Sequence, residues 1–222
     1  MWQRRIYTIT LILVPLVVVL FFVFSVSDTN AKQAQPADTW STFEMIYSES
    51  RYGLGFNGDY GTQRIKFTYD DAYHWRVDLL SHSAMPEIVG SWSIYNGTEL
   101  QSFDPRVGHE MVTDVSQDSS IYLAAEWLRP SYIRFLLLKD NARLLPSSIE
   151  GQQVMEISEE IQCSQPVEIE EQAGLKPCDS TNKRQTTRQI TYLEQEDIPL
   201  RIVDTMDGIV VQEIVVEELN FK

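Results

Sequence analysis

Alternating apolar and polar positions dominate the sequence and predict mostly β-strands. A period of two puts every second side chain on the same face of a strand, so an alternating segment has one apolar face. Asn96-Gly97 and Asp207-Gly208 are pairs that favour tight hairpins. Alternating segments, or short apolar runs bounded by turn residues, occur at 63–69, 74–79, 90–95, 99–103, 153–161, 188–194, 200–204 and 209–219. Most of the chain is therefore expected to form antiparallel strands.

Three segments have apolar residues at helical spacing instead. Residues 39–50 place Trp40, Phe43 and Tyr47 three or four positions apart, which predicts a helix. Residues 121–128 and 132–139 are predicted as two short helices. The order helix, strands, helices, strands predicts an α+β fold, in which helices close one side of a curved antiparallel sheet, an incomplete β-barrel.

The amino-terminal segment predicts the compartment. Residues 6–24 contain no charged side chain, and Arg4 and Arg5 precede them. As a helix these 19 residues would measure roughly 28 Å, close to the hydrocarbon core of a bilayer. We expect one transmembrane helix, kept as a signal anchor or cleaved as a signal peptide after Ser27 or Ala31. Because the arginines stay in the cytoplasm, the rest is expected to be extracytoplasmic.

The predicted organisation follows from this segment. Residues 1–27 form the signal anchor or signal peptide, residues 28–38 a polar tether, and residues 39–222 one folded extracytoplasmic domain. The localisation expected is the cell membrane, crossed once, with the folded domain outside the cytoplasm.

Charge and composition narrow the classes of function. The 222 residues include 18 basic and 32 acidic side chains, a net charge of -14. This balance argues against nucleic acid and, for the folded part, against an anionic membrane surface as partner. His74, His82 and His109 are scattered, and no Gly-rich phosphate loop or Gly-x-Ser-x-Gly elbow occurs. We expect neither enzymatic activity, nor a metal, nor a cofactor, and an exported hydrolase finds no positive support.

Two hairpin motifs resemble those of a known superfamily. The first is the stretch from Ser91 to Gly97, with the sequence SWSIYNG. The second combines IPLRI at 198–202 with DGIVV at 207–211. Over residues 39–221 they resemble the LolA-like lipoprotein-carrier superfamily, which includes LolA, LolB, LppX-type proteins and the RseB sensor domain. The resemblance implies an apolar cavity between sheet and helices that accepts acyl chains.

The apolar strand faces are the candidate ligand site. Under the resemblance, the sheet and the helical lid would line the cavity with Ile65, Phe67, Tyr69, Trp75, Val77, Leu79, Trp92, Ile94, Leu136 and Leu137. Periodicity alone favours an ordinary filled core, and the resemblance is what brings in the cavity. A cavity predicts a protein that holds a lipid or the acyl chains of a lipoprotein. A filled core predicts an envelope sensor or regulatory interaction domain of the RseB-like type, which recognises a partner protein.

Cys163 and Cys178 are the two cysteines of the chain, separated by 14 residues. In an exported protein the two thiols can be oxidised to a disulfide. A disulfide that closes a loop of about 15 residues contributes about 3 kcal/mol to the free energy of unfolding. Because the spacing is not Cys-x-x-Cys, we expect a structural disulfide rather than a redox-active pair.

Overall fold

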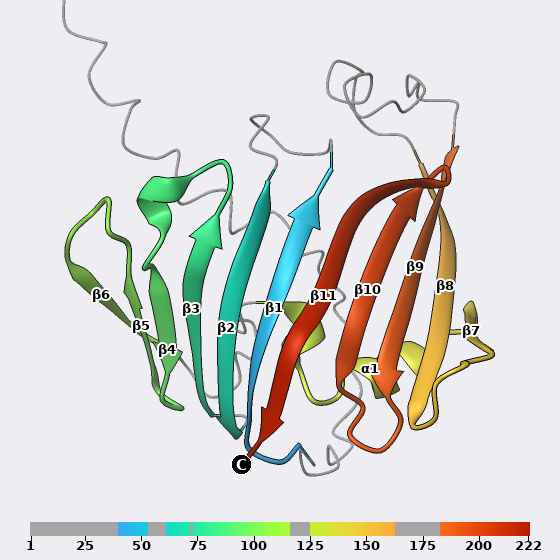
Figure 1. Cartoon of the computed structure of the whole chain (residues 1–222), viewed down its shortest axis with the longest axis horizontal. Helices are drawn as coiled ribbons and strands as arrows, with labels where there is room; N and C mark the ends of the chain where they lie inside the picture. Colours follow the sequence, from blue (N-terminus) through green and yellow to red (C-terminus); the bar gives the residue numbers. More distant parts are fainter. Residues whose placement is uncertain (1–39, 53–60, 72, 116–124, 163–182) are drawn as a thin grey trace, which may run out of the picture. The chain divides into compact units, whose positions relative to one another are not determined.

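The structure is a computed structural model that describes residues 40–52, 61–71, 73–115, 125–162 and 183–222. These residues belong to one compact unit, Pro36–Lys222. Within it, eleven strands form one antiparallel sheet in the order β6-β5-β4-β3-β2-β1-β11-β10-β9-β8-β7 (Figure 1). Strands β1 to β6 form one meander, β7 to β11 form another, and the pairing of β1 with β11 joins the two.

The elements have the following bounds. The first meander consists of β1 (Phe43–Arg51), β2 (Thr62–Asp71), β3 (His74–His82), β4 (Trp92–Tyr95), β5 (Glu99–Phe103) and β6 (Glu110–Asp114). The second consists of β7 (Ala142–Leu145), β8 (Gln152–Gln162), β9 (Lys183–Leu193), β10 (Pro199–Met206) and β11 (Ile209–Phe221). The helical elements are η1 (Pro86–Ile88), η3 (Glu126–Leu128) and α1 (Tyr132–Leu137).

The sheet corrects the predicted α+β class. The described residues contain one α-helix of six residues and two 3-10 helices, which is too little helix to close a sheet of eleven strands. The regular secondary structure of the described residues is therefore almost entirely β-strand. The predicted transmembrane helix is not found either, because no helix in the described part of the chain is long and apolar enough to cross a membrane. Residues 6–24, where it was expected, lie outside the described residues.

The predicted helix over residues 39–50 is also wrong, because most of that segment forms β1. Phe43, Met45 and Tyr47 are buried, and the residues between them are only partly buried. Three large apolar side chains two positions apart give a strand face, although Trp40, Phe43 and Tyr47 also fit a helical spacing. Pairing with β2 on one side and β11 on the other makes β1 a central strand.

The other strand predictions are confirmed, and so is the helix predicted over residues 132–139, which is α1. Residues 126–128 of the other predicted helix form η3, and residues 121–124 lie outside the described residues. Besides β1, two strands were not predicted. They are β6 and β7, the short strands at the two edges of the sheet (Figure 1).

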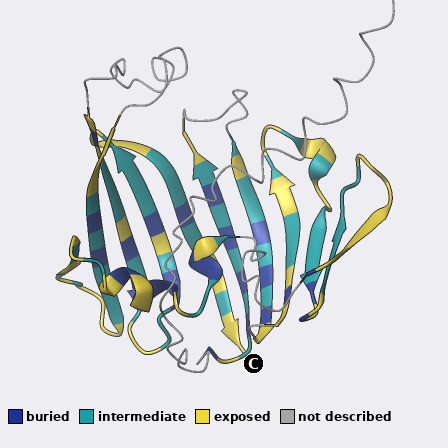
Figure 2. Cartoon of the chain, turned by 180° about the vertical axis from the view of Figure 1, so that it is seen from behind, coloured by how far each residue is buried: buried dark blue, intermediate teal, exposed yellow. Residues whose placement is uncertain are grey.

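The two faces of the sheet differ in character. We call the face that carries the buried side chains of β1 the inner face, and η3 and α1 lie over its β7–β11 side (Figure 2). The outer face carries ion pairs. Lys66–Glu44, Arg201–Glu213 and Arg143–Glu156 join neighbouring strands, and Arg64–Glu217 reaches from β2 past β1 to β11. Exposed pairs of this kind contribute about 0–1 kcal/mol each, so the inner face supplies most of the stability.

Candidate functional site

Aromatic side chains cluster on the inner face of β1 to β4. The ring centroids of Phe43 and Tyr69 lie 5.3 Å apart in a stacked arrangement. Trp40 packs edge-on against both rings, at 5.4 and 5.5 Å. Phe67 and Trp75 continue the cluster along the face, with their ring centroids 6.5 Å apart. All of these side chains are buried, so this part of the inner face is a packed apolar layer.

The other half of the inner face is covered by η3 and α1. Trp127 of η3 packs edge-on against Tyr47 of β1, with ring centroids 4.8 Å apart. Beneath the two helices, four directly paired and buried residues form an apolar row across the sheet: Ile214, Ile202, Ile190 and Met155. Leu128, Ile133 and Leu136 are buried against the same cluster. The space under these helices is therefore occupied by the protein's own side chains.

The structure brings together seven of the ten predicted lining residues. Buried positions in the inner-face cluster are taken by Ile65, Phe67, Tyr69, Trp75 and Leu136. Val77 and Leu79 are partly buried and pack against the same cluster. Leu137, the neighbour of Leu136 on α1, is exposed instead.

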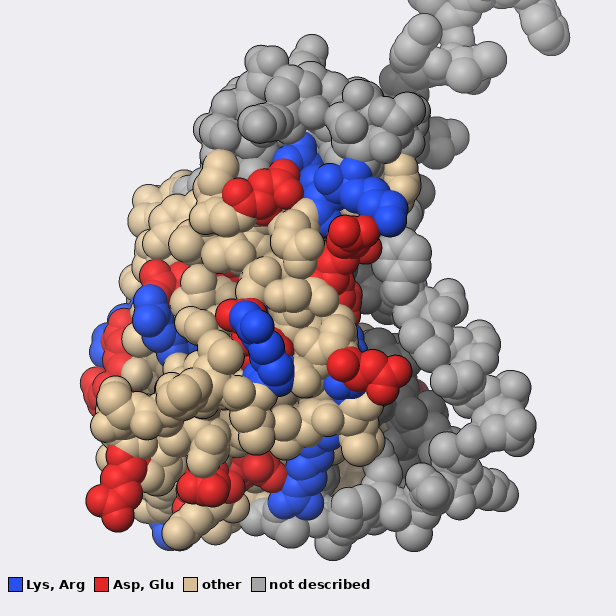
Figure 3. All heavy atoms as spheres, turned by 90° about the vertical axis from the view of Figure 1, so that its right-hand side faces the viewer, with Lys and Arg blue, Asp and Glu red and all other residues tan. Residues whose placement is uncertain are grey.

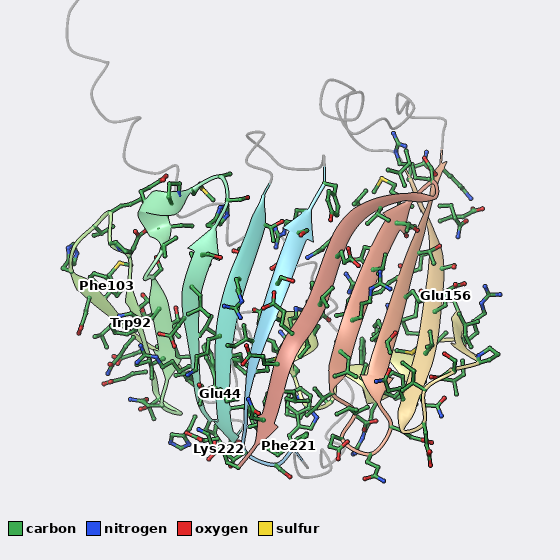
Figure 4. The ribbon with its side chains drawn as sticks, viewed as in Figure 1. Glu44, Trp92, Phe103, Glu156, Phe221 and Lys222 are labelled. Atoms are coloured by element: carbon green, nitrogen blue, oxygen red, sulfur yellow. The ribbon has the colours of Figure 1, made fainter. Side chains whose placement is uncertain are left out.

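The prediction that Trp92 and Ile94 share this face is wrong. In β4, Tyr95 pairs with Trp75 and Ser93 with Val77, so the odd-numbered residues face inward. Trp92 lies on the outer face, where it stacks on Phe103 at 6.1 Å (Figure 4). The guanidinium of Arg76 lies 5.5 Å from the centre of the Trp92 ring, a cation–π contact. The sequence could not decide which side chains of β4 face inward, because apolar residues occupy both faces of this strand.

A row of polar residues follows the apolar row and was not predicted. Gln212, Asp204 and Arg188 are directly paired across β11, β10 and β9. The Nε and Nη2 atoms of Arg188 donate to the two carboxylate oxygens of Asp204, both at 2.7 Å, and Nη1 donates to the hydroxyl of Tyr132 at 2.8 Å. The bidentate pair joins β9 to β10, and the hydrogen bond to Tyr132 connects α1 to the sheet.

The environment of this row keeps its groups in defined charge states. Burial is the largest influence on the pKa of Arg188 and acts to lower it. The hydrogen bonds and charges of Asp204 and Tyr132 outweigh burial, so the pKa rises and the guanidinium stays charged. Burial raises the pKa of Tyr132, against a smaller lowering effect of Arg188, so its hydroxyl stays protonated. Because both pKa values are raised, neither the guanidinium of Arg188 nor the hydroxyl of Tyr132 exchanges its proton readily near neutral pH.

Glu49 is a buried acid at the border of the apolar layer, with 6% of its surface exposed. Its carboxylate accepts hydrogen bonds from Nε of Arg51 at 2.7 Å, Nε2 of Gln63 at 2.8 Å and Nε2 of Gln212 at 2.7 Å. Burial, followed by the charge of Glu49, raises the pKa of Tyr47. The sequence contains a sign that Glu49 faces inward, because Glu49 continues the alternation of Phe43, Met45 and Tyr47.

Taken together, the inner face is an apolar layer with a polar border whose charges are paired. Within the described residues, no group of three or more His, Cys, Asp or Glu is placed to hold a metal ion. Cys163 and Cys178 lie outside the described residues. The chemistry that the inner face offers is burial of apolar surface.

No family model and no curated protein sequence matches the chain. Several solved structures do, at probability 1.00. An uncharacterized conserved protein from Thermus thermophilus is 10% identical over 83% of this chain and 81% of its own, with a TM-score of 0.43. A LolA superfamily protein from Nitrosomonas europaea is 11% identical over 84% of this chain and 90% of its own, with a TM-score of 0.37.

The Pseudomonas aeruginosa MucA/MucB complex also matches, at 14% identity and a TM-score of 0.41. This match covers 82% of the present chain, which spans about half (52%) of that protein. One of these structures is described as a LolA superfamily protein, the superfamily that the two hairpin motifs of this chain resemble. The likeness is one of fold alone.

Proposed function

We propose that this domain binds, without catalysis, an apolar chain such as the acyl group of a lipid or of a lipid-modified protein. One observation carries the proposal. The apolar inner face continues from the fully buried cluster to side chains on β3 and β5 that are only partly buried, namely Val77, Leu79 and Leu100. Among the described elements, no helix lies over β3 to β6 (Figure 2).

The acyl site proposed here differs in place from the cavity expected under a helical lid. The surface below η3 and α1 is already covered by Trp127 and Leu128. The partly buried residues lie instead on the first meander, beside the aromatic cluster. Each methylene removed from water contributes about 0.8 kcal/mol, so one long acyl chain laid along this strip supplies ample affinity.

We further propose that the domain works outside the cytoplasm. Arg4 and Arg5 precede an uncharged stretch of 19 residues, the arrangement typical of exported proteins. A lipid or lipoprotein ligand is available in the cell envelope, so the location and the ligand class support each other.

A photoreactive fatty acid tests the acyl site. It is crosslinked to the full chain, and the labelled residues are mapped by mass spectrometry, so that labelling of the uncharged stretch at 6–24 is distinguished from labelling of β3 and β5. We expect label on both strands. Val77→Asp should reduce it about tenfold or more, because a carboxylate on the strip must lose its hydration without a partner.

Ile94→Asp is the matched control. Ile94 lies on the neighbouring strand and is also partly buried, but its side chain is on the outer face. We expect unchanged labelling and a similar melting temperature for the two variants. Equal labelling of Val77→Asp and the parent protein would exclude the acyl site. In that case, an interaction domain that recognises a partner protein would become the better hypothesis. If Val77→Asp does not fold, the milder Val77→Ser serves in the same comparison.

A further inference from the structure

Strand β6 ends the sheet on the side of the first meander, and no described element pairs with its outer edge (Figure 1). All residues of this strand, Glu110–Asp114, are exposed. The strand contains no Pro, and its register with β5 has no bulge, so two common protections of a sheet edge are missing. Among the described residues, β6 therefore presents a regular strand edge without a partner.

One hydrogen bond shows which backbone amides of β6 point to this open edge. The N–H of Val115 donates to the carbonyl of Thr98 at 2.8 Å, so the amide of Val115 is directed toward β5. In an antiparallel ladder, alternate residues of a strand direct their amides to the same side. The other odd-numbered residues of β6 therefore also bond to β5, and the N–H and C=O groups of Glu110, Val112 and Asp114 point outward.

The side chains of these three residues lie on the outer face of the sheet. Val112 pairs with Gln101, which in turn pairs with Ile94 of the outer face. Val112 is 58% exposed, and an acid stands two positions away from it on either side. The open edge thus presents an acidic, an apolar and an acidic side chain in succession on one face.

The charges of Glu110 and Asp114 are not neutralised within the described part of the chain. Neither carboxylate takes part there in an ion pair or a side-chain hydrogen bond, and Asp114 is paired across the ladder with a third acid, Glu99. Arg106, the nearest arginine in the sequence, is held by Asp104, with Nη2 and Oδ2 2.6 Å apart. A strand that pairs with this edge gains most if it places cations opposite the two acids.

The opposite edge of the sheet, β7, differs in this respect. Arg143, the one charged residue of β7, is paired with Glu156 of the neighbouring strand. Figure 3 looks onto this side of the molecule and shows basic and acidic groups close together. Of the two edges, β6 is therefore the one that combines outward-pointing amides with unneutralised charge.

We infer that β6 binds an extended basic segment of a partner protein, which adds to the sheet as a further antiparallel strand. The backbone of this segment bonds to the outward N–H and C=O groups of Glu110, Val112 and Asp114. Its outer-face side chains are basic, apolar and basic in succession, so that they pair with the two acids and pack on Val112. The net charge of -14 attracts such a segment from a distance. The inference is independent of the acyl ligand proposed for the inner face.

A second copy of this chain fits the same edge less well. Antiparallel pairing of two β6 strands about Val112 would set Glu110 of each copy opposite Asp114 of the other. Like charges directly opposite one another destabilise a pair of strands. The charges of β6 therefore act against self-association and in favour of a basic partner.

Hydrogen exchange of the full chain in the presence of a synthetic peptide tests strand addition. The probe is acetyl-Thr-Lys-Thr-Val-Thr-Lys-Thr-amide, and the control peptide has Asp in place of both Lys. We expect the Lys peptide to slow exchange of the amides of Glu110, Val112 and Asp114. The amides of the odd-numbered residues between them are already bonded to β5 and should not change. At the same concentration the Asp peptide should give no protection.

Two changes on β6 separate backbone pairing from charge. Val112→Pro removes the central outward N–H and keeps the bonds to β5, because this amide does not point toward β5. It should lower the affinity for the Lys peptide about tenfold or more, whereas the matched control Val112→Thr, which keeps the N–H, should bind as the parent chain does. Glu110→Lys combined with Asp114→Lys should reverse the preference, so that the Asp peptide binds better than the Lys peptide. This reversal keeps the inference testable if the Pro variant does not fold.

Three results would overturn the inference. The first is equal binding of the two peptides to the parent chain. The second is an affinity of folded Val112→Pro equal to that of the parent, or peptide-induced protection confined to residues outside 110–114. The third is a dimer of the parent chain in sedimentation that Val112→Pro dissociates, since a second copy would then occupy the edge.

Discussion

Glu44 and Glu49 show how one residue type takes two roles within a single strand. They are five positions apart in β1, so they lie on opposite faces of the sheet. Glu44, labelled in Figure 4 near the start of β1, pairs with Lys66 at 2.9 Å on the solvated outer face. Glu49 is buried on the inner face with three side-chain donors around its carboxylate.

Replacement of the two acids should therefore differ in its cost. Glu49→Ala leaves the amides of Gln63 and Gln212 without their acceptor, and we expect the free energy of unfolding to fall by about 1–3 kcal/mol. Glu44→Ala should cost no more than about 1 kcal/mol. Urea unfolding of the full chain, followed by fluorescence, measures both. Equal costs would contradict the assignment of Glu49 to a buried hydrogen-bond centre.

At this scale, the sequence predicted the burial of Phe67 and Trp75 but placed Trp92 on the wrong face, and it did not predict the polar contacts. Phe67 and Trp75 follow from alternation, because a large apolar side chain on a strand gains most by burial. Arg188 and Asp204 could not be paired in advance. Their contact depends on the register between β9 and β10, which no local pattern encodes.

Among the elements, β1 and the edge strands were the difficult cases. Residues 43–47 satisfy both a strand pattern and a helical one over a short length, and tertiary pairing on both sides of β1 decides for the strand. All residues of β6 are exposed, so it has no buried face to produce an alternation. An edge strand has one pairing partner, and its sequence is correspondingly less constrained.

The β10–β11 turn gives a prediction at the scale of one element. Asp207 and Gly208 have φ angles of 51° and 81°, the left-handed region that Gly adopts at little cost. A Cβ on Gly208 would meet no atom within 4 Å, so Gly208→Ala should cost about 1 kcal/mol through the backbone alone.

Gly208→Asn is the matched control for this turn. Asn tolerates the left-handed region better than Ala does, so this variant should lose less stability. Melting temperatures of the two variants against the parent chain provide the comparison. A larger loss for the Asn variant would show that the turn is held by contacts other than its backbone angles.

The pairing of β1, the first strand, with β11, the last strand, joins the two halves of the sheet. Phe43 at the start of β1 pairs with Phe221 at the end of β11, and the N–H of Lys222 donates to the carbonyl of Thr42 at 2.9 Å. This pairing joins two meanders into one sheet with one inner-face cluster. A sheet assembled from such distant segments is expected to fold slowly compared with a helical domain.

The state of the two cysteines, free or joined in a disulfide, is a prediction that depends on where the protein is located in the cell. If the domain is exported, Cys163 and Cys178 should be joined, because an oxidising environment favours the disulfide and no other Cys competes. Mass mapping of protein isolated from its own compartment, alkylated before lysis, measures this. Two free thiols would contradict both the disulfide and the proposed extracytoplasmic location.

The sequence by itself determined most of the segments that form strands, where two hairpins turn, and which side chains prefer burial. These properties are local, since alternation, turn residues and transfer from water act over a few neighbouring positions. Tertiary structure alone decided that β1 is a strand, that β4 turns Tyr95 rather than Trp92 inward, and that Arg188 meets Asp204 and Tyr132. Each of these depends on the register between segments, and a shift of one residue in register exchanges the two faces of a strand.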